Sequence, residues 1–212
     1  MEYKSQIGQD KYIVENIFGR KKNGYFIELG ACDGELFSNT YYLEKHLDWK
    51  GICIEPNPNF TEKLKQNRNC NLSFSPVFSE SGKKVIFTVD NLGELSGISD
   101  YITHNIKNFT EIELETKTLT QILDECSAPS YIDYLSLDTE GSELEVLKGL
   151  DFDKYTIGYI CVEHNFRPLR YKIMDFLFQK GYKHARWNRF DDEYMHDTLG
   201  IKFCWSDCTT EL

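Results

Sequence analysis

Acidic and polar residues follow several of the apolar runs in this 212-residue sequence. If these runs are parallel strands, their carboxyl ends lie at one edge of a sheet, where ligands of such sheets bind. Carboxylates at that edge can accept hydrogen bonds from hydroxyl groups or bind a hard metal ion, and an imidazole can take up a proton. The residues in these positions are Asp33, Glu55, Asp138, Glu163, His164 and Asn165.

The stretch from Tyr25 to Gly34 has the layout of a strand followed by a tight turn. Gly30 and Gly34 can adopt positive φ and would let a ligand approach the backbone closely. A second apolar run, 51–54, ends on Glu55, where a carboxylate can bind both hydroxyls of a ribose. Together these two stretches predict a site for a nucleotide-like ligand.

Two nucleotide-like ligands compete for this site. A nicotinamide dinucleotide, as in a dehydrogenase, calls for a GxGxxG turn and neutral or basic surroundings. The turn here is GxxxG and carries Glu28 and Asp33. Acidic surroundings suit the cationic amino and sulfonium groups of S-adenosylmethionine, so the residues favour this methyl donor. Glu55 serves either ligand and does not discriminate between them.

Transfer of a methyl group to a hydroxyl needs a way to remove the hydroxyl proton, and two sets of residues offer one. In the first, His164 is the general base and Asp138 or Glu163 orients it. In the second, Asp138, Glu163 and Asn165 bind a divalent cation such as Mg²⁺ or Mn²⁺, for which oxygen ligands are suited. Asp138 and Glu140 have a competing interpretation, because both could simply cap the helix expected from Ser142.

Apolar runs that alternate with helical patterns predict an α/β fold with a mostly parallel sheet and helices on both faces. An early helix is expected around 12–18, and the segment 83–89 is expected to pair antiparallel with the strand at 72–78. The segment 91–99 reads as a polar lid loop and 188–197 as a polar connection. The expected strands are 25–29, 51–54, 72–78, 83–89, 111–117, 131–137, 155–162, 182–187 and 200–205, and the later helices are 41–49, 61–66, 119–126 with Thr118 as N-cap, 142–150 and 169–180.

The composition predicts one globular domain, since 41% of the residues are hydrophobic. A formal charge of −10 disfavours a nucleic-acid partner. No stretch is apolar enough to span a membrane. Seven cysteines without a CxxC pair indicate reduced thiols, Cys204 and Cys208 included, and hence a soluble cytoplasmic protein. We expect an N-terminal helical cap (1–24), a cofactor-binding core (25–165) and a C-terminal helix with the last strands (166–212). The whole could also be one domain of a longer polypeptide.

Several motifs resemble the FkbM family of S-adenosylmethionine-dependent methyltransferases. They are Ser5–Asp10, Phe26–Gly34, Ser38–Thr40, Trp49–Pro56, Ile132–Gly149 and Val162–Asn165, in the order that the family has them. The resemblance implies a class I methyltransferase fold, which is Rossmann-like with a seven-stranded sheet. It also implies activity on hydroxyls of sugars or natural products.

The family's roles can be transferred to the matching positions. Glu28, Gly30 and Asp33 would line the methionine end of the cofactor, Glu55 would bind the ribose, and Phe78 with Ser79 would lie near the adenine. The segment 38–40 could close over the cofactor or merely cap a helix, and Gln6, Gln9 and Asp10 have the same two interpretations. The full expected set of cofactor-binding residues is Glu28, Gly30, Ala31, Asp33, Gly34, Ser38, Asn39, Thr40, Glu55, Pro56, Phe78, Ser79 and Asp138.

The acceptor side is expected to involve Glu140, His164, Arg167 and Tyr194, with Arg170, Asp191 and Asp192 as further candidates. The polar and aromatic mix from Trp187 to Tyr194 suits a sugar, although a solvated loop has the same composition. The sequence thus predicts methyl transfer to a hydroxyl of a sugar in a glycan or glycoconjugate, for example a deoxysugar such as rhamnose, with a linked glycosyltransferase as a partner. The alternatives are a non-sugar metabolite as acceptor, or a binding domain without turnover.

Overall fold

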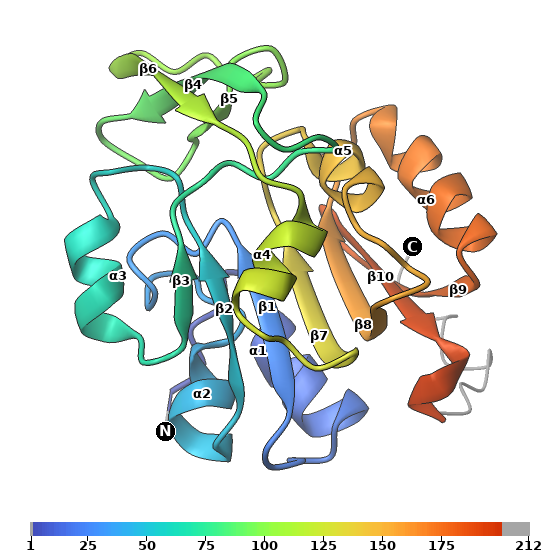
Figure 1. The fold of residues 1–212 in the computed structure, drawn as a ribbon. Coiled ribbons are helices and arrows are strands. Elements are labelled where there is room, and N and C mark those ends of the chain that lie inside the picture. The colour runs from blue at the N-terminus through green and yellow to red at the C-terminus, as the bar shows by residue number, and fades with distance from the viewer. Residues whose placement is uncertain (1, 201–212) are drawn as a thin grey trace.

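A seven-stranded sheet forms the centre of the protein, seen in a computed structural model that describes residues 2–200 (Figure 1). The strand order is β3-β2-β1-β7-β8-β10-β9. Neighbours from β3 to β8 pair in parallel, and β10 pairs antiparallel with both β8 and β9. The strands are β1 (Tyr25–Leu29), β2 (Lys50–Ile54), β3 (Asn71–Ser73), β7 (Tyr131–Leu137), β8 (Thr156–Glu163), β9 (Tyr182–Asn188) and β10 (Asp191–His196).

The direction of strand order reverses at β1, which lies between β2 and β7. Chain segments that leave β1 and β7 therefore diverge to opposite sides, and a crevice opens at their carboxyl ends. Phe26 of β1 is in register with Gly51 of β2 and with Tyr134 of β7. This register brings the ends of the two strands, Leu29 and Leu137, side by side.

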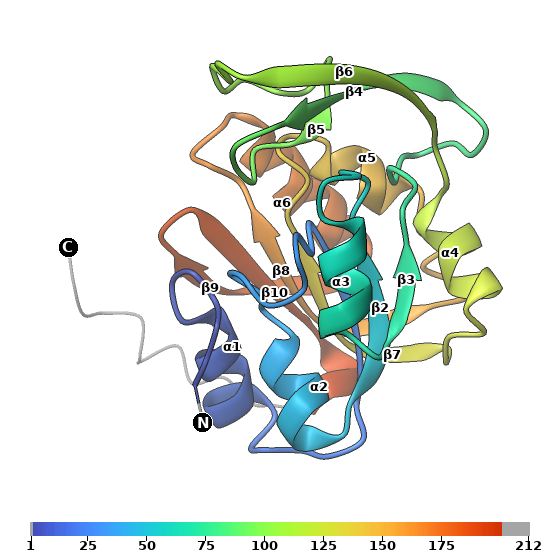
Figure 2. The ribbon, with the colours of Figure 1, turned by 90° about the vertical axis from the view of Figure 1, so that its left-hand side faces the viewer.

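Helices cover both faces of this sheet, as the sequence predicts (Figure 2). On one face, side chains of the N-terminal helices, α2 and α3 pack with Phe26 and Tyr134. On the other, side chains of α4, α5 and α6 pack with Ile27 and Leu137. The helices are α1 (Gln9–Tyr12), the π-helix η1 (Ile13–Ile17), α2 (Tyr41–Leu47), α3 (Thr61–Asn67), α4 (Leu119–Glu125), α5 (Glu143–Lys148), α6 (Leu169–Gln179) and the 3₁₀ helix η2 (Asp197–Leu199).

A second sheet of three antiparallel strands lies above the carboxyl edge of the main sheet (Figures 1 and 2). It consists of β4 (Lys84–Asp90), β5 (Gly97–Ile98) and β6 (Phe109–Glu115), in the order β5-β4-β6. We call residues 84–115 the lobe. Its core contains Val85 and Phe87, and Phe78, which precedes the lobe in the chain, packs with them. The lobe brings a segment of the expected polar loop, 94–98, over the crevice.

The pairing expected between 72–78 and 83–89 is wrong. The strand β3 ends at Ser73, and β4 pairs with β5 and β6 instead. Pro76 lacks the N–H that a continuing strand would donate. Its carbonyl instead accepts a hydrogen bond from Lys117 N at 3.0 Å, which redirects the chain toward the lobe.

The polar connection expected at 188–197 is also wrong, because it contains the buried strand β10. Three consecutive acidic residues there, Asp191 to Glu193, are each at most 3% exposed. The expected strand 200–205 lies, apart from Gly200, outside the described residues. No helix within residues 2–200 is long and apolar enough to cross a bilayer.

Candidate active site

A cavity of about 280 Å³ lies at the carboxyl edge of the main sheet, where the strand order reverses. Its floor consists of residues at the ends of β1, β2, β7 and β8, its roof is the lobe, and Gln6 and Gln9 of the N-terminal segment close one side. Residues expected in the site that line it are Gln6, Gln9, Glu28, Gly30, Asn39, Glu55, Pro56, Asp138, Glu140, Glu163, Asn165 and Asp191.

Gly30 gives the turn after β1 its close contact with β7. Its φ is 76°, and a Cβ at this position would overlap the carbonyl oxygen of Asp138. The next two backbone N–H groups are already engaged, since Ala31 N donates to Ile54 O at 3.2 Å and Cys32 N donates to Glu55 Oε2 at 2.9 Å. The turn is therefore fixed to β2 as well as to β7.

Glu55 presents a buried carboxyl group to the cavity, with only 5% of the residue exposed. It accepts hydrogen bonds from Cys32 N and Asn57 N, at 2.9 and 2.8 Å. Burial nevertheless raises the pKa of Glu55 to about 7, because two backbone donors offset only part of the lost hydration. The position and chemistry are those expected for a group that binds ribose hydroxyls.

Glu28 lies at the centre of a buried hydrogen-bond network beneath the cavity. Its carboxylate accepts bonds from the hydroxyls of Ser38 and Thr40, from Asn39 N and from Arg68 Nη1. Ser38 and Thr40 thus point their hydroxyls at Glu28 and do not line the cavity, whereas Asn39 does. The network holds the segment 38–40 against the turn after β1.

Two other residues expected in the turn are used for local structure and do not line the cavity. Asp33 Oδ1 accepts hydrogen bonds from Glu35 N and Leu36 N, at 3.0 and 2.7 Å. Gly34 is in contact with Arg68, where a Cβ would lie 2.6 Å from Arg68 Cγ. Arg68 itself was not predicted, because no local pattern signals an ion pair across forty residues.

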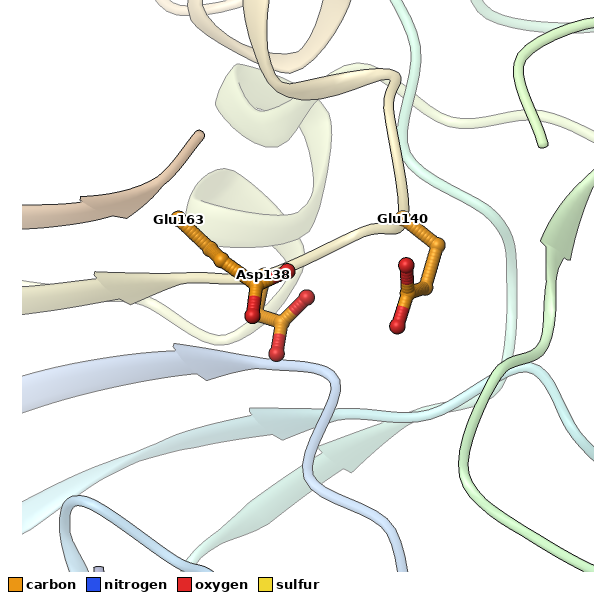
Figure 3. Close-up of side chains that lie close together, drawn as sticks. All are labelled: Asp138, Glu140 and Glu163. Carbon is orange, nitrogen blue, oxygen red and sulfur yellow. The ribbon is translucent and has the colours of Figure 1, made fainter. Parts of the chain in front are cut away.

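Three acidic side chains converge on one wall of the cavity (Figure 3). Asp138 follows β7, Glu140 lies in the turn before α5, and Glu163 ends β8. One oxygen from each lies within 4.8 Å of the others. Burial and the nearby charge of Asp138 raise the pKa of Glu163 to about 11 and that of Glu140 to about 8. Burial also raises the pKa of Asp138.

The third expected metal ligand, Asn165, is a hydrogen-bond donor in this structure. It lines the cavity, but its side-chain N–H donates to Glu163 Oε2 at 2.7 Å. It presents a donor to Glu163 and not an oxygen to the centre of the group. The third clustered carboxyl group is that of Glu140.

His164, expected as the general base, lies on the opposite face of the sheet from Glu163. Its Nδ1 accepts from Phe166 N at 3.0 Å, and its Nε2 is 3.9 Å from Asp192 Oδ1. It does not line the cavity. Glu163 is paired with Asp191, which lines the cavity, whereas His164 lies near Asp192, which is paired with Val162 and does not line it. Glu163 and His164 therefore do not face the same site.

Several residues that were expected to contact the methyl acceptor lie near His164, in a second cluster of polar side chains. Asp192 forms a two-bond ion pair with Arg170 at 2.6 and 2.7 Å and contacts His184 Nε2 at 2.9 Å. Tyr194 is fully buried, and its hydroxyl faces Asp192 at 3.5 Å. These contacts fix α6 to β9 and β10. The buried side chain of Tyr194 therefore does not contact the methyl acceptor, although the sequence had suggested that it would.

The two residues expected near an adenine are also away from the cavity. Phe78 packs in the core of the lobe, and its ring meets that of Tyr101 edge-on at 5.7 Å. Ser79 donates to Glu145 Oε2 at 2.7 Å. The wall that replaces them contains Pro76 and Val77, just before these positions.

His104 is a cavity residue that sequence reasoning missed. Its Nε2 lies 3.0 Å from Glu140 Oε2 and 2.9 Å from Arg167 Nη2. Burial and the Arg167 charge lower its pKa, so the imidazole is neutral at pH 7. Two glycines permit this contact between the lobe and the turn after β7. A Cβ at Gly97 would lie 3.1 Å from Thr139 O, and one at Gly141 would lie 2.5 Å from Tyr101 O.

A family model described as the methyltransferase FkbM domain matches residues 28–184, most of the chain and all of the cavity floor. The chain belongs to the FkbM methyltransferase family. This confirms the resemblance inferred from the motifs. The FkbM chain has the class I methyltransferase fold, and the family and fold support dependence on S-adenosylmethionine.

Solved structures give further likenesses. The FkbM methyltransferase of Methylobacillus flagellatus KT is 14% identical with a TM-score of 0.51, over 84% of this chain and 44% of that one. The chain thus spans less than half of that protein's length. A precorrin-6y C5,15-methyltransferase of Geobacter metallireducens (10% identity, 82% and 81% coverage, TM-score 0.47) and a methyltransferase of Pyrococcus furiosus (15%, 92% and 86%, 0.44) are also similar. No curated protein matches the chain significantly.

Proposed function

We propose that this FkbM domain transfers a methyl group from S-adenosylmethionine to a hydroxyl of a sugar in a glycan or glycoconjugate. The observation that carries the proposal is the cavity at the reversal of strand order, with Glu55 on one side and an acidic wall on the other. The hydroxyls of a ribose need a hydrogen-bond acceptor, which Glu55 offers on one side of the cavity. A cationic sulfonium needs negative charge nearby, which the acidic wall offers on the other side.

The chain's own residues can bind the methyl donor in one orientation. Glu55 would accept hydrogen bonds from the ribose hydroxyls, with Pro56 beside it. The glycine turn 30–32 leaves room for the methionine end. Pro76, Val77 and Ile98 offer apolar surface for the adenine. S-adenosylmethionine supplies an electrophilic methyl group on its sulfonium.

Positioning of the acceptor supplies much of the rate in such a displacement, because the hydroxyl oxygen must lie in line with the bond that breaks. Asp138 Oδ1 is buried in the cavity wall and accepts no hydrogen bond within residues 2–200. It can therefore hold the acceptor hydroxyl. His164 is not retained as the base because it lies on the other face of the sheet.

The acceptor would enter between the lobe and the turn 139–141. This entrance offers the polar groups of Glu94, Ser96, His104 and Glu140. A sugar needs several hydrogen-bonding groups at once, and this wall provides both donors and acceptors. Gln9, whose amide donates to Asp191 Oδ2 at 2.7 Å, would help exclude water from the opposite side. We also propose that residues 1–24 serve as a cap of this single domain.

Release of S-adenosylhomocysteine over a panel of sugars and glycosides tests the proposal. Turnover on sugars, with no turnover on non-sugar alcohols of similar size, would support it. Turnover on non-sugar alcohols alone would overturn the sugar assignment. A rise in melting temperature with NAD but none with S-adenosylhomocysteine would overturn the choice of cofactor.

A further inference from the structure

We propose that Asp138, Glu140 and Glu163 bind a single divalent cation of the Mg²⁺ or Mn²⁺ type in the wall of the cavity. The binding itself follows from these three side chains. Only the role of the ion in catalysis rests on the proposed methyl transfer. The ligand set differs from the one that the strand ends suggested, because Glu140 replaces Asn165.

The geometry requires little movement. Figure 3 shows the carboxyl groups of Asp138 and Glu140 turned toward each other, with that of Glu163 beside Asp138. One oxygen from each is within 4.8 Å of the other two. Adjacent ligands of an octahedral Mg²⁺ at about 2.1 Å are about 3 Å apart, so each carboxylate would move inward by about an ångström. Side-chain rotation provides such a shift.

One oxygen of the group has no hydrogen-bond donor. Asp138 Oδ1 is buried and accepts no hydrogen bond from residues 2–200, whereas Glu140 Oε2 has His104 Nε2 at 3.0 Å and Arg167 Nη2 at 3.6 Å. Glu140 as a whole is only 8% exposed. Buried acceptors are nearly always satisfied in folded proteins, so an unsatisfied Asp138 Oδ1 beside two further carboxyl groups points to a group that occupies the space between them.

The balance of charges in this wall also favours a bound cation. Within residues 2–200, neither Asp138 nor Glu163 forms an ion pair with a lysine or arginine. Glu140 has Arg167 Nη2 at 3.6 Å and the neutral His104 at 3.0 Å. A single guanidinium is thus opposed to three buried carboxyl groups. Protonation can relieve the excess charge, and so can a cation.

The type of ion follows from the ligands. All three are carboxylates, which are hard oxygen donors and suit Mg²⁺ or Mn²⁺ better than softer metals. Three protein ligands leave coordination positions open toward the cavity. A hydroxyl oxygen bound in one of them would have a lowered pKa and a fixed position, which a methyl acceptor requires.

A titration of the complete chain with Mn²⁺ alone tests the proposal. Binding is measured as the loss of the free-ion signal in electron paramagnetic resonance. We expect one Mn²⁺ per chain. Each of Asp138→Asn, Glu140→Gln and Glu163→Gln should weaken binding by more than about tenfold. Glu145→Gln is the matched control, because its carboxylate lies on the neighbouring helix and contacts Lys148 and Ser79. It should bind Mn²⁺ as the wild type does.

Melting curves with and without S-adenosylhomocysteine show whether each variant is folded. Absence of Mn²⁺ binding to the wild type would overturn the proposal, as would equal binding by the three variants and the control. Methyl transfer is measured separately. Mn²⁺ binding without transfer to any acceptor would refute the proposed function and leave the cation site standing, whereas transfer resistant to EDTA with no Mn²⁺ bound would do the reverse.

Discussion

Arg68 Nη1 lies 3.0 Å from Glu28 Oε2, and both side chains are at most 3% exposed. Arg68 also reaches Glu44 Oε2 with Nε at 2.7 Å and Thr40 Oγ1 with Nη2 at 2.8 Å. A single guanidinium therefore joins the end of α3 to β1, to α2 and to the segment 38–40. The cavity floor depends on this residue although Arg68 does not line the cavity.

Replacement of Arg68 by Met should destabilise the protein by about 3–5 kcal/mol, because the carboxylate of Glu28 would stay buried without its counter-charge. The measurement is the free energy of unfolding in urea. Lys84→Met removes the exposed ion pair with Glu113 and should leave the free energy of unfolding nearly unchanged. Adding Glu28→Gln to Arg68→Met should restore part of the lost stability. Equal losses for Arg68→Met and Lys84→Met would contradict a buried ion pair between Arg68 and Glu28.

Gly30→Ala and Gly82→Ala form a matched pair. Both glycines have a left-handed backbone, with φ of 76° and 77°. A Cβ at Gly82 meets nothing within 4 Å, whereas one at Gly30 overlaps Asp138 O. Both variants should lose about 1 kcal/mol to backbone strain. Only Gly30→Ala should lose several more and lose affinity for S-adenosylhomocysteine. Similar unfolding curves for the two variants would show that Gly30 does not lie close to Asp138 O.

Glu55→Gln should weaken binding of S-adenosylhomocysteine by about 10- to 100-fold, the size of one or two lost hydrogen bonds to a charged group. Isothermal titration calorimetry at pH 8, above the raised pKa of about 7, measures it on the ionised group. Adenine alone, which lacks the ribose, should bind both proteins equally. Unchanged affinity for S-adenosylhomocysteine would place the ribose elsewhere.

The stability of the ligand-free protein should fall between pH 5 and pH 8. The pKa of Glu140 rises from its ordinary 4.5 to about 8 in the folded state, so the unfolded chain loses this proton first. Stability from the protonated form is complete below pH 4.5 and is lost as the pH rises through 8. Urea unfolding at each pH measures the slope, and Glu140→Gln should flatten it. A slope unchanged in this variant would mean that Glu140 titrates normally.

The sequence predicts the parts of the fold that repeat a simple pattern. The runs that became β1 and β7 are mostly apolar, interrupted by Glu28 in β1 and by Asp133 and Ser136 in β7. Thr118 caps α4 as expected, with Oγ1 accepting from Gln121 N at 3.1 Å. The strand β10 was not predictable because its three acidic residues look solvated. They are buried with polar partners, since Gln9 and Arg170 reach them from distant segments and Arg186 from the neighbouring strand β9.

The candidate site also has a part that the sequence could predict and a part that it could not. Glu55, Asp138 and Glu163 converge because the ends of adjacent parallel strands must meet at one edge. If the alternation of side chains in β8 is continued by one residue, His164 points away from Glu163, and this could have been noticed in advance. His104 could not have been predicted, since its loop has no periodic pattern and only the glycine contacts of the lobe bring it to Glu140.

The lobe enters the chain as one continuous insertion between β3 and α4, yet it forms the whole roof of the cavity. The floor comes from short turns after separate strands, each tied to its neighbours. Roof and floor can therefore change independently. A graft of another insertion between residues 79 and 117 would exchange the wall that faces the acceptor and leave Glu55 and Gly30 in place. This modular division would let one cofactor scaffold acquire new acceptors through changes in a single segment.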